Sequence, residues 1–247
     1  MAGETIKTEA ICLDIRPWSR TSHIVSWLTP TGKVATVVKG AVRAKSQFLG
    51  QYDLNYTCDI VYYARARGEL HALREAVPVE MREALRGDYR KLALAGYFRR
   101  LVAELAPMGE ECQAWYEELV RSLSCLVPCA SCLVRFELMV LKLSGLKPDF
   151  SKFDKNAEWS SFSLETGAFG SGEGRCIRVS REVAEYLACM AGAGRLRPPG
   201  CHGNLSVPRK NPQVPLDAAR VIGVFYQFHL DCASDVRRTV LGMISPS

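Results

Sequence analysis

The chain has 247 residues, enough for one large domain or two small ones. Hydrophobic residues make up 48% of it and charged residues 23%, which excludes a disordered chain too polar to bury a core. The net charge of +6 is moderate, so the distribution of the basic residues is more informative than their sum.

The N-terminal residues indicate a protein that is not exported. Residues 1–9 are polar and lack the apolar core of a secretion signal, and no apolar run reaches the length of a membrane span. The ten cysteines are scattered along the chain, which indicates reduced thiols and not a disulfide framework. We therefore expect a cytoplasmic protein with no membrane association.

The first third of the chain is predicted to form five short strands. Alternating and β-branched runs, separated by turn residues, place them at Thr5–Ile15, His23–Leu28, Lys33–Val38, Tyr56–Tyr63 and Leu70–Glu75. Residues 65–69 are the expected turn of the last hairpin, and Pro78 is expected to end the segment. Five short strands with one long connection between the third and the fourth are typical of a small closed barrel.

After the strands, the spacing of apolar residues becomes helical. Asp88 can cap a helix that runs to Leu105. Further helices are predicted at Glu110–Leu126, Ser131–Gly145, Ser180–Ala191 and Leu216–Cys232, the last continuing to Met243. A polar insertion at about 147–178, with a hairpin at 160–169, and a proline-rich loop at 194–215 interrupt the helices. We expect an α+β protein with a barrel domain at 1–79 and a helical domain at 80–247.

The stretch Arg16–Tyr52 is basic and contains no Asp or Glu. Because a solvated face of an ordinary domain mixes both signs, this stretch favours an anionic partner such as nucleic acid. The candidate phosphate contacts are its six cations, Arg16, Arg20, Lys33, Lys39, Arg43 and Lys45. The candidate stacking residues for unpaired bases are Trp18, Phe48 and Tyr52. Two alternatives stay open: the rings can fill the barrel core, and the stretch can be an exposed loop without a ligand.

Motifs for covalent chemistry are absent from the sequence. There is no P-loop, no dinucleotide-binding glycine fingerprint and no Gly-x-Ser-x-Gly. Cys129 and Cys132 have the spacing of zinc and redox sites, but no second pair of ligands accompanies them and both flanks are predicted to be helical. We therefore expect buried helical cysteines there, and no enzymatic activity, metal or cofactor.

The order of these features resembles the RecO family of bacterial DNA repair and recombination mediators over essentially the whole chain. The resemblance is carried by Lys39-Gly40-Ala41, Arg43, Lys45-Ser46, Leu49-Gly50-Gln51-Tyr52, Arg135-Phe136-Glu137-Leu138 and Leu143-Ser144-Gly145-Leu146-Lys147-Pro148. It implies an N-terminal OB-fold followed by an α-helical domain. It also implies binding of single- and double-stranded DNA and annealing of complementary strands. In the RecFOR pathway the family works with RecR to load RecA onto strands coated by the single-strand DNA-binding protein.

The resemblance also implies a partner site and a location. In the family, the helical domain can bind the acidic C-terminal tail of the single-strand DNA-binding protein. Arg135, with Phe136 and Leu138 beside it, matches the family position, and Arg121 is a second candidate; Arg135 can instead pair with a helical Glu. A protein of this family is expected at the nucleoid in the bacterial cytoplasm, and we expect this chain to be monomeric on its own.

The sequence departs from the family in its insertion. Many members carry four zinc-binding cysteines there, whereas Asp149–Asp154 contains no cysteine pair. The resemblance therefore implies a degenerate, zinc-less finger in this chain. The alternative to a DNA-binding mediator is a protein-interaction scaffold whose basic barrel contacts an acidic protein partner.

Overall fold

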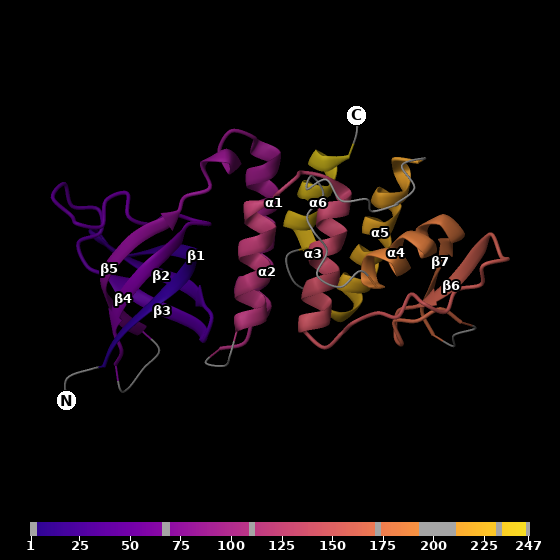
Figure 1. Ribbon diagram of the computed structural model, residues 1–247, viewed down its shortest axis with the longest axis horizontal. Coiled ribbons are helices and arrows are strands. Elements are labelled where there is room, and N and C mark those ends of the chain that lie inside the picture. The colour runs from indigo at the N-terminus through magenta and orange to yellow at the C-terminus, as the bar shows by residue number, and fades with distance from the viewer. Residues whose placement is uncertain are drawn as a thin grey trace. The chain divides into compact units, whose positions relative to one another are not determined.

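The structure is a computed structural model that describes residues 4–65, 70–108, 112–170, 174–192, 211–230 and 234–245 (Figure 1). It divides into two compact units, Met1–Ser124 and Cys125–Ser247. The turn predicted at 65–69 lies almost wholly outside the described residues, as does most of the loop predicted at 194–215. Within the described segments, no helix is both long and apolar enough to cross a membrane.

The first unit begins with a closed five-stranded barrel in the order β1-β2-β3-β5-β4. Its strands are β1 (Thr5–Ser19), β2 (Ser22–Thr29), β3 (Gly32–Val38), β4 (Thr57–Tyr63) and β5 (Leu70–Glu80). Neighbouring strands are antiparallel except β3 and β5, which pair in parallel. A small five-stranded barrel of this kind is OB-fold-like, and it confirms the predicted fold class together with the helices that follow.

The barrel is filled by apolar side chains that alternate along its strands. Trp27 is fully buried at its centre, where its indole N–H donates a hydrogen bond to the Thr36 hydroxyl at 2.8 Å. The prediction that Pro78 ends the strand segment is wrong, because β5 continues to Glu80. At Pro78 the strand has only β4 as a neighbour, and proline is tolerated at such an edge.

A short 3₁₀ helix, η1 (Glu83–Leu85), and two α-helices, α1 (Tyr89–Leu105) and α2 (Gln113–Ser124), complete the first unit. Asp88 caps α1 as predicted, accepting a hydrogen bond from the backbone N–H of Arg90 at 2.9 Å. The backbone N–H of Cys112 donates to the carbonyl of Pro30 at 2.9 Å, and Tyr116 donates to the carboxylate of Glu9. These bonds tie the helices to the barrel, whereas the domain boundary at 79/80 stays a prediction.

The second unit contains α3 (Ala130–Leu143), α4 (Arg181–Gly192), α5 (Gln213–His229) and α6 (Ser234–Ile244). Helix α5 packs against both α3 and α4. Arg237 on α6 reaches into this helical core and holds Glu137 on α3 through two hydrogen bonds, at 2.7 and 2.9 Å. It also donates to the carbonyl of Ala219 at 2.6 Å. Gly223 on α5 makes room for the guanidinium, since a Cβ there would lie 2.2 Å from Arg237 Nη1.

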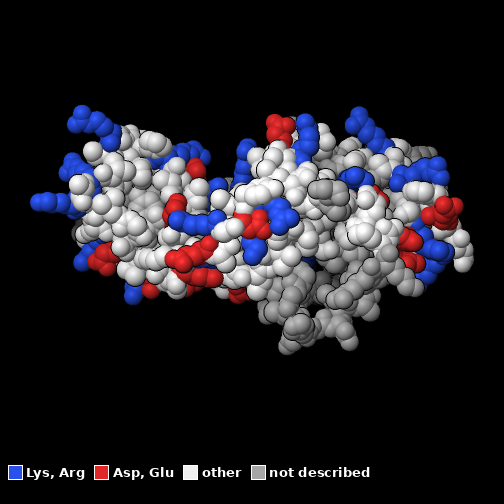
Figure 2. Space-filling model, turned by 90° about the horizontal axis from the view of Figure 1, so that it is seen from above, with Lys and Arg blue, Asp and Glu red and all other residues white. Residues whose placement is uncertain are grey.

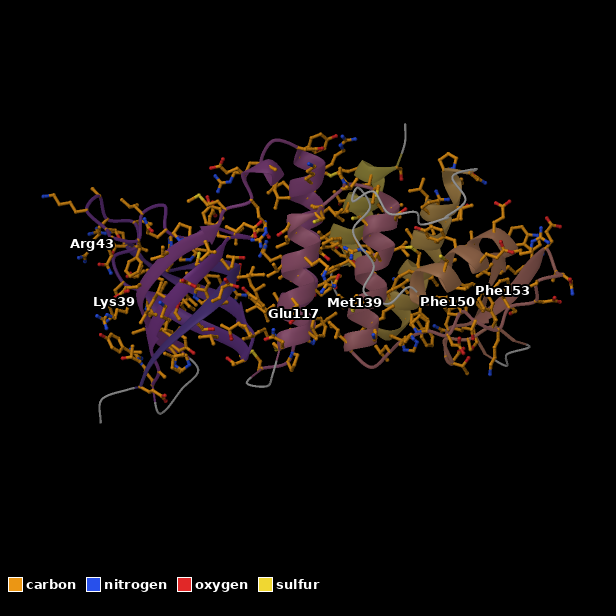
Figure 3. All side chains as sticks on the ribbon, viewed as in Figure 1. Lys39, Arg43, Glu117, Met139, Phe150 and Phe153 are labelled. Carbon is orange, nitrogen blue, oxygen red and sulfur yellow. The ribbon has the colours of Figure 1, made fainter. Side chains whose placement is uncertain are left out.

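The insertion forms a two-stranded sheet of β6 (Trp159–Ser163) and β7 (Cys176–Ser180). The predicted hairpin within 160–169 is present only as a single bridge between Phe162 and Phe169, and the main partner of β6 is β7. Phe150, which Figure 3 labels in the insertion, stacks on Phe162 with ring centroids 5.2 Å apart. Phe225 of α5 lies 5.8 Å from Phe162. The described part of the insertion thus has an apolar core of aromatic rings.

The ion pair between Glu137 and Arg237 yields a stability prediction. Arg237→Ala should lower the free energy of unfolding by roughly 3–5 kcal/mol, because Glu137 has no exposed side-chain surface and loses its bidentate partner. Urea unfolding followed by circular dichroism measures the change.

The neighbouring arginine provides the matched control. The side chain of Arg238 is 83% exposed, so Arg238→Ala should change the free energy of unfolding by less than about 0.5 kcal/mol. Joint replacement Glu137→Leu with Arg237→Met should recover most of the loss, because it removes the buried charge along with its partner. Equal effects of the two single arginine substitutions would contradict the assignment.

Candidate nucleic-acid interface

The tip of the β1–β2 hairpin and the end of β3 meet at one end of the barrel. Pairing of β2 with both strands places His23 between Pro17 of β1 and Val38 of β3. The chain then enters the long connection to β4, residues 39–56, and this connection is bonded to the hairpin tip. The backbone N–H of Gly40 donates to the Ser22 hydroxyl at 3.3 Å, which fixes the start of the connection beside the hairpin.

These two segments enclose a pocket of about 440 Å³. Its volume lies within the range of pockets that hold small organic ligands, about 300–1,000 Å³. The pocket is lined by Trp18, Ser19, Thr21, Ser22, Val37, Lys39, Gly40 and Arg43. Its wall therefore combines one aromatic ring, two cations, three hydroxyl groups, one valine and one glycine.

Trp18 lies at an irregularity in β1. The pairing register shifts between Pro17, which faces His23, and Ser19, which faces Ser22, so Trp18 is the extra residue of a β-bulge. Ile15 packs against the barrel core, so the alternation of the strand already places Trp18 on the outer side, as it does Arg16. Trp18 is 60% exposed, which is a large apolar surface for a residue next to a barrel core.

Gly40 shapes the opposite wall. Its backbone adopts φ +66°, a left-handed conformation that favours glycine, and a Cβ there would lie 3.2 Å from Cδ of Arg43. The stem of Arg43 therefore folds back over the turn. Lys39 and Arg43 both stand at the loop end of the barrel (Figure 3).

The cations at this end are exposed. Arg20, Lys39, Arg43 and Lys45 have no acidic partner within 4.0 Å among the residues that the structure describes. Seen from above, Lys and Arg side chains gather at the loop end of the barrel unit (Figure 2, left). Arg16 is also exposed, but its guanidinium pairs with Asp14 on the same strand. The end of the barrel thus presents four cations that are available for an anionic ligand.

Three of the residues predicted for DNA binding lie elsewhere. Lys33 is half-buried and donates from Nζ to the carbonyl of Ala103 on α1 at 2.9 Å, and burial lowers the pKa of its ammonium group. Phe48 is 8% exposed within the barrel core. Tyr52 packs against Trp27 and shares a hydrogen bond with Nδ1 of His23 at 2.9 Å.

Burial raises the pKa of Tyr52 to about 12. Phe48 and Tyr52 therefore fill the barrel core, which is the alternative that the sequence left open for them. We leave both residues and Lys33 out of the proposed interface.

Sequence reasoning missed the hydroxyl groups of Ser19, Thr21 and Ser22. The sequence feature that could have identified them is the run of small polar residues at a hairpin tip. Small side chains allow a ligand to come close to the backbone.

The residues predicted for partner binding are less accessible. On α3, Arg135 is 9% exposed, Phe136 is fully buried and Leu138 is 7% exposed. Arg121, on α2 in the other unit, is half-buried and pairs with Glu118 at 2.6 Å. Among the described residues, no three His, Cys, Asp or Glu side chains gather as they would around a metal ion.

Comparison with known proteins agrees with the fold. Residues 1–82 match the family described as Recombination protein O N terminal, and residues 86–234 match Recombination protein O C terminal. The DNA repair protein RecO of Alkaliphilus metalliredigens is 30% identical over 178 residues, 70% of each chain. The RecO protein of Anaeromyxobacter sp. strain K is 26% identical over 95% of each chain. The RecO protein of Moorella thermoacetica is 29% identical over 58% of this chain and 54% of its own. On the strength of both domain matches, the chain belongs to the RecO family of DNA repair proteins.

Proposed function

We propose that this chain binds single-stranded DNA at the loop end of its barrel as a mediator of DNA repair and homologous recombination. The observation that carries the proposal is the pocket in which the exposed ring of Trp18 stands beside Lys39 and Arg43. Cations neutralise phosphates and release counterions, while an exposed ring offers a face on which any base can stack. An acidic protein surface would use the cations but would gain less from the indole, which favours DNA over the scaffold alternative.

Arg20 and Lys45 extend the cationic surface beyond the pocket. They are exposed on the hairpin tip and on the connection between β3 and β4. Contacts of this kind act on the phosphate backbone, so they serve double-stranded DNA as well as single strands. We expect little preference for base sequence, because no described helix is presented as a reader of base edges.

Family membership extends the proposal to annealing and to protein partners. Annealing requires no covalent chemistry: cations on one surface reduce the repulsion between two phosphate backbones, and a stacking ring holds bases available for pairing. We propose that the chain acts with RecR to load RecA onto strands coated by the single-strand DNA-binding protein. This work would place it at the nucleoid in the bacterial cytoplasm.

The tail of the single-strand DNA-binding protein needs a cation beside an apolar pocket. Arg135 has that setting on α3, but its burial requires neighbouring side chains to move before a carboxylate can reach it. Arg121 is 29% exposed and could exchange Glu118 for the tail carboxylate. We therefore propose Arg135 as the tail contact, with Arg121 in the other unit as the alternative candidate, and single Arg→Ala substitutions followed by peptide binding distinguish them.

The cations of the connection give the first DNA-binding prediction. Replacing Arg43 and Lys45 together by Ala should leave the melting temperature nearly unchanged, because exposed charges contribute little to folding. Affinity for single-stranded DNA should fall by a similar factor for all sequences. The log–log dependence of affinity on salt should lose about 0.7 per contact, or roughly 1.4 for both. Fluorescence anisotropy with labelled oligonucleotides over a salt series measures the slope.

A second pair of basic residues serves as the control. Arg90 and Lys91 on α1 belong to the same unit but do not line the pocket. Their joint replacement by Ala removes two positive charges, as the replacement of Arg43 and Lys45 does. Affinity should then change little, and the salt slope should stay close to that of the unmodified chain. If both double variants lower the slope equally, the net charge is responsible and the barrel end is not the interface.

The indole ring gives an independent prediction. Trp18→Ala should weaken binding of single-stranded DNA by about 5- to 150-fold, since stacking contributes about 1–3 kcal/mol per base. The salt slope should not change, because no cation is lost. Trp18→Phe should retain a large part of the affinity. Tyr89, 68% exposed on α1, is the matched aromatic control, and Tyr89→Ala should bind DNA normally. Full affinity in Trp18→Ala would remove the ring from the site.

A further inference from the structure

The two cysteines of the Cys-x-x-Cys motif occupy different positions at the start of α3. Cys132 lies in the first turn and is 1% exposed, as predicted for a buried helical cysteine. Cys129 precedes the helix as its N-cap residue, with extended backbone at φ −142° and ψ 160°, and it is half-buried. The prediction that both are buried helical residues is therefore wrong for Cys129.

The surroundings of Cys129 favour a thiolate. The Cys132 thiol and the backbone N–H groups of Ser131 and Cys132 lie near the Cys129 sulfur, at the positive end of the helix dipole. Arg135, buried one turn further along α3, adds a positive charge. Together these groups lower the pKa of Cys129 well below that of a free cysteine, whereas the neighbouring Cys129 sulfur and burial raise the pKa of Cys132.

A second helix closes the site. Tyr186 on α4 is 3% exposed, and its hydroxyl lies close to the Ser131 hydroxyl without a hydrogen bond of regular geometry to any described residue. Burial raises the pKa of Tyr186 to about 12, so it stays a neutral donor beside the sulfur pair. Among the residues that the structure describes, the titratable and charged groups that face Cys129 are thus Cys132 and Arg135 from α3 and Tyr186 from α4.

We propose that Cys129 and Cys132 form a reactive dithiol toward low-molecular-weight disulfides, with Cys129 as the nucleophile and Cys132 as the resolving thiol. The geometry is that of a nucleophilic sulfur at a helix N-terminus with a second sulfur one turn along. The element directly before this helix is α2 and not a strand, so the site differs from the strand-to-helix junction of an α/β oxidoreductase. The proposal is independent of DNA binding, which uses the other unit.

The reaction proceeds in two exchanges. The Cys129 thiolate attacks one sulfur of the small disulfide, forms a mixed disulfide and releases one thiolate. That thiolate takes the proton of Cys132, and the Cys132 sulfur then attacks the Cys129 sulfur and expels the second thiolate. The protein dithiol is oxidised to a disulfide, and the small disulfide is reduced to two thiol equivalents.

Alkylation of the native chain tests the nucleophile. Because its pKa is lowered, Cys129 should be ionised to a much larger extent at pH 6 than a free cysteine, whose pKa is about 8.5. The lower nucleophilicity of an acidic thiolate offsets only part of this gain. Iodoacetamide followed by peptide mass spectrometry should therefore show Cys129 reacting several-fold faster than a free-cysteine peptide. The advantage should vanish in concentrated urea, and an equal rate in native and unfolded chains would overturn the proposal.

Treatment with glutathione disulfide tests the pair. The native chain should form a disulfide between Cys129 and Cys132 in preference to mixed disulfides at Cys176 and Cys189, which are exposed. The Cys132→Ser variant should accumulate the mixed disulfide between glutathione and Cys129. The Cys129→Ser variant should leave Cys132 unmodified. Melting curves show whether each variant folds, and Cys132→Ala replaces Cys132→Ser if the buried hydroxyl prevents folding. Modification of Cys176 and Cys189 while the pair stays reduced would refute the dithiol.

Discussion

The parallel pairing of β3 with β5 is the constraint on which the barrel and its binding end depend. Because β5 lies between β3 and β4, the chain cannot turn directly from one into the other and must cross the barrel end through residues 39–56. This connection is fixed at several points. Gly40 bonds to the hairpin tip, Gln47 donates to the carbonyl of Arg74 on β5, and Phe48 inserts into the core. The order of the strands therefore produces a connection that is anchored at several points and carries the cations. Anchoring lowers the conformational entropy that is lost when a ligand binds.

The same stretch divides its aromatic residues between two tasks. Trp27, Phe48 and Tyr52 supply the apolar volume that a small barrel needs, and the polar atoms of Trp27 and Tyr52 find partners within it. Trp18 lies at the bulge in β1, outside that core, and is exposed at the surface. The core rings pack the strands together, and strand β1 positions the ring of Trp18 at the pocket.

The sequence was sufficient for features that are set locally. Turn residues and alternation located the five strands, and Asp88 located the start of α1. It also indicated the acid-free basic stretch and the resemblance to the family. What it missed depends on long-range contacts. The bond from Lys33 to α1 spans 70 positions, and the alternation of a strand gives no sign of the bulge at Trp18. Helix α3 begins at Ala130 and not at the predicted Ser131, and sequence patterns do not resolve a difference of one residue.

The ion pair between Glu137 and Arg237 has a consequence for how the protein is made. The two residues are 100 positions apart, so a ribosome adding about 5–20 residues per second produces Arg237 roughly 5–20 s after Glu137. During that interval the Glu137 carboxylate on α3 lacks the two hydrogen bonds that Arg237 donates, and closing the helical core around it would bury the charge without them. All strands and helices of the barrel unit precede α3 in the chain. The nascent chain can therefore finish its barrel first, while its helical half waits for the last helix to be translated.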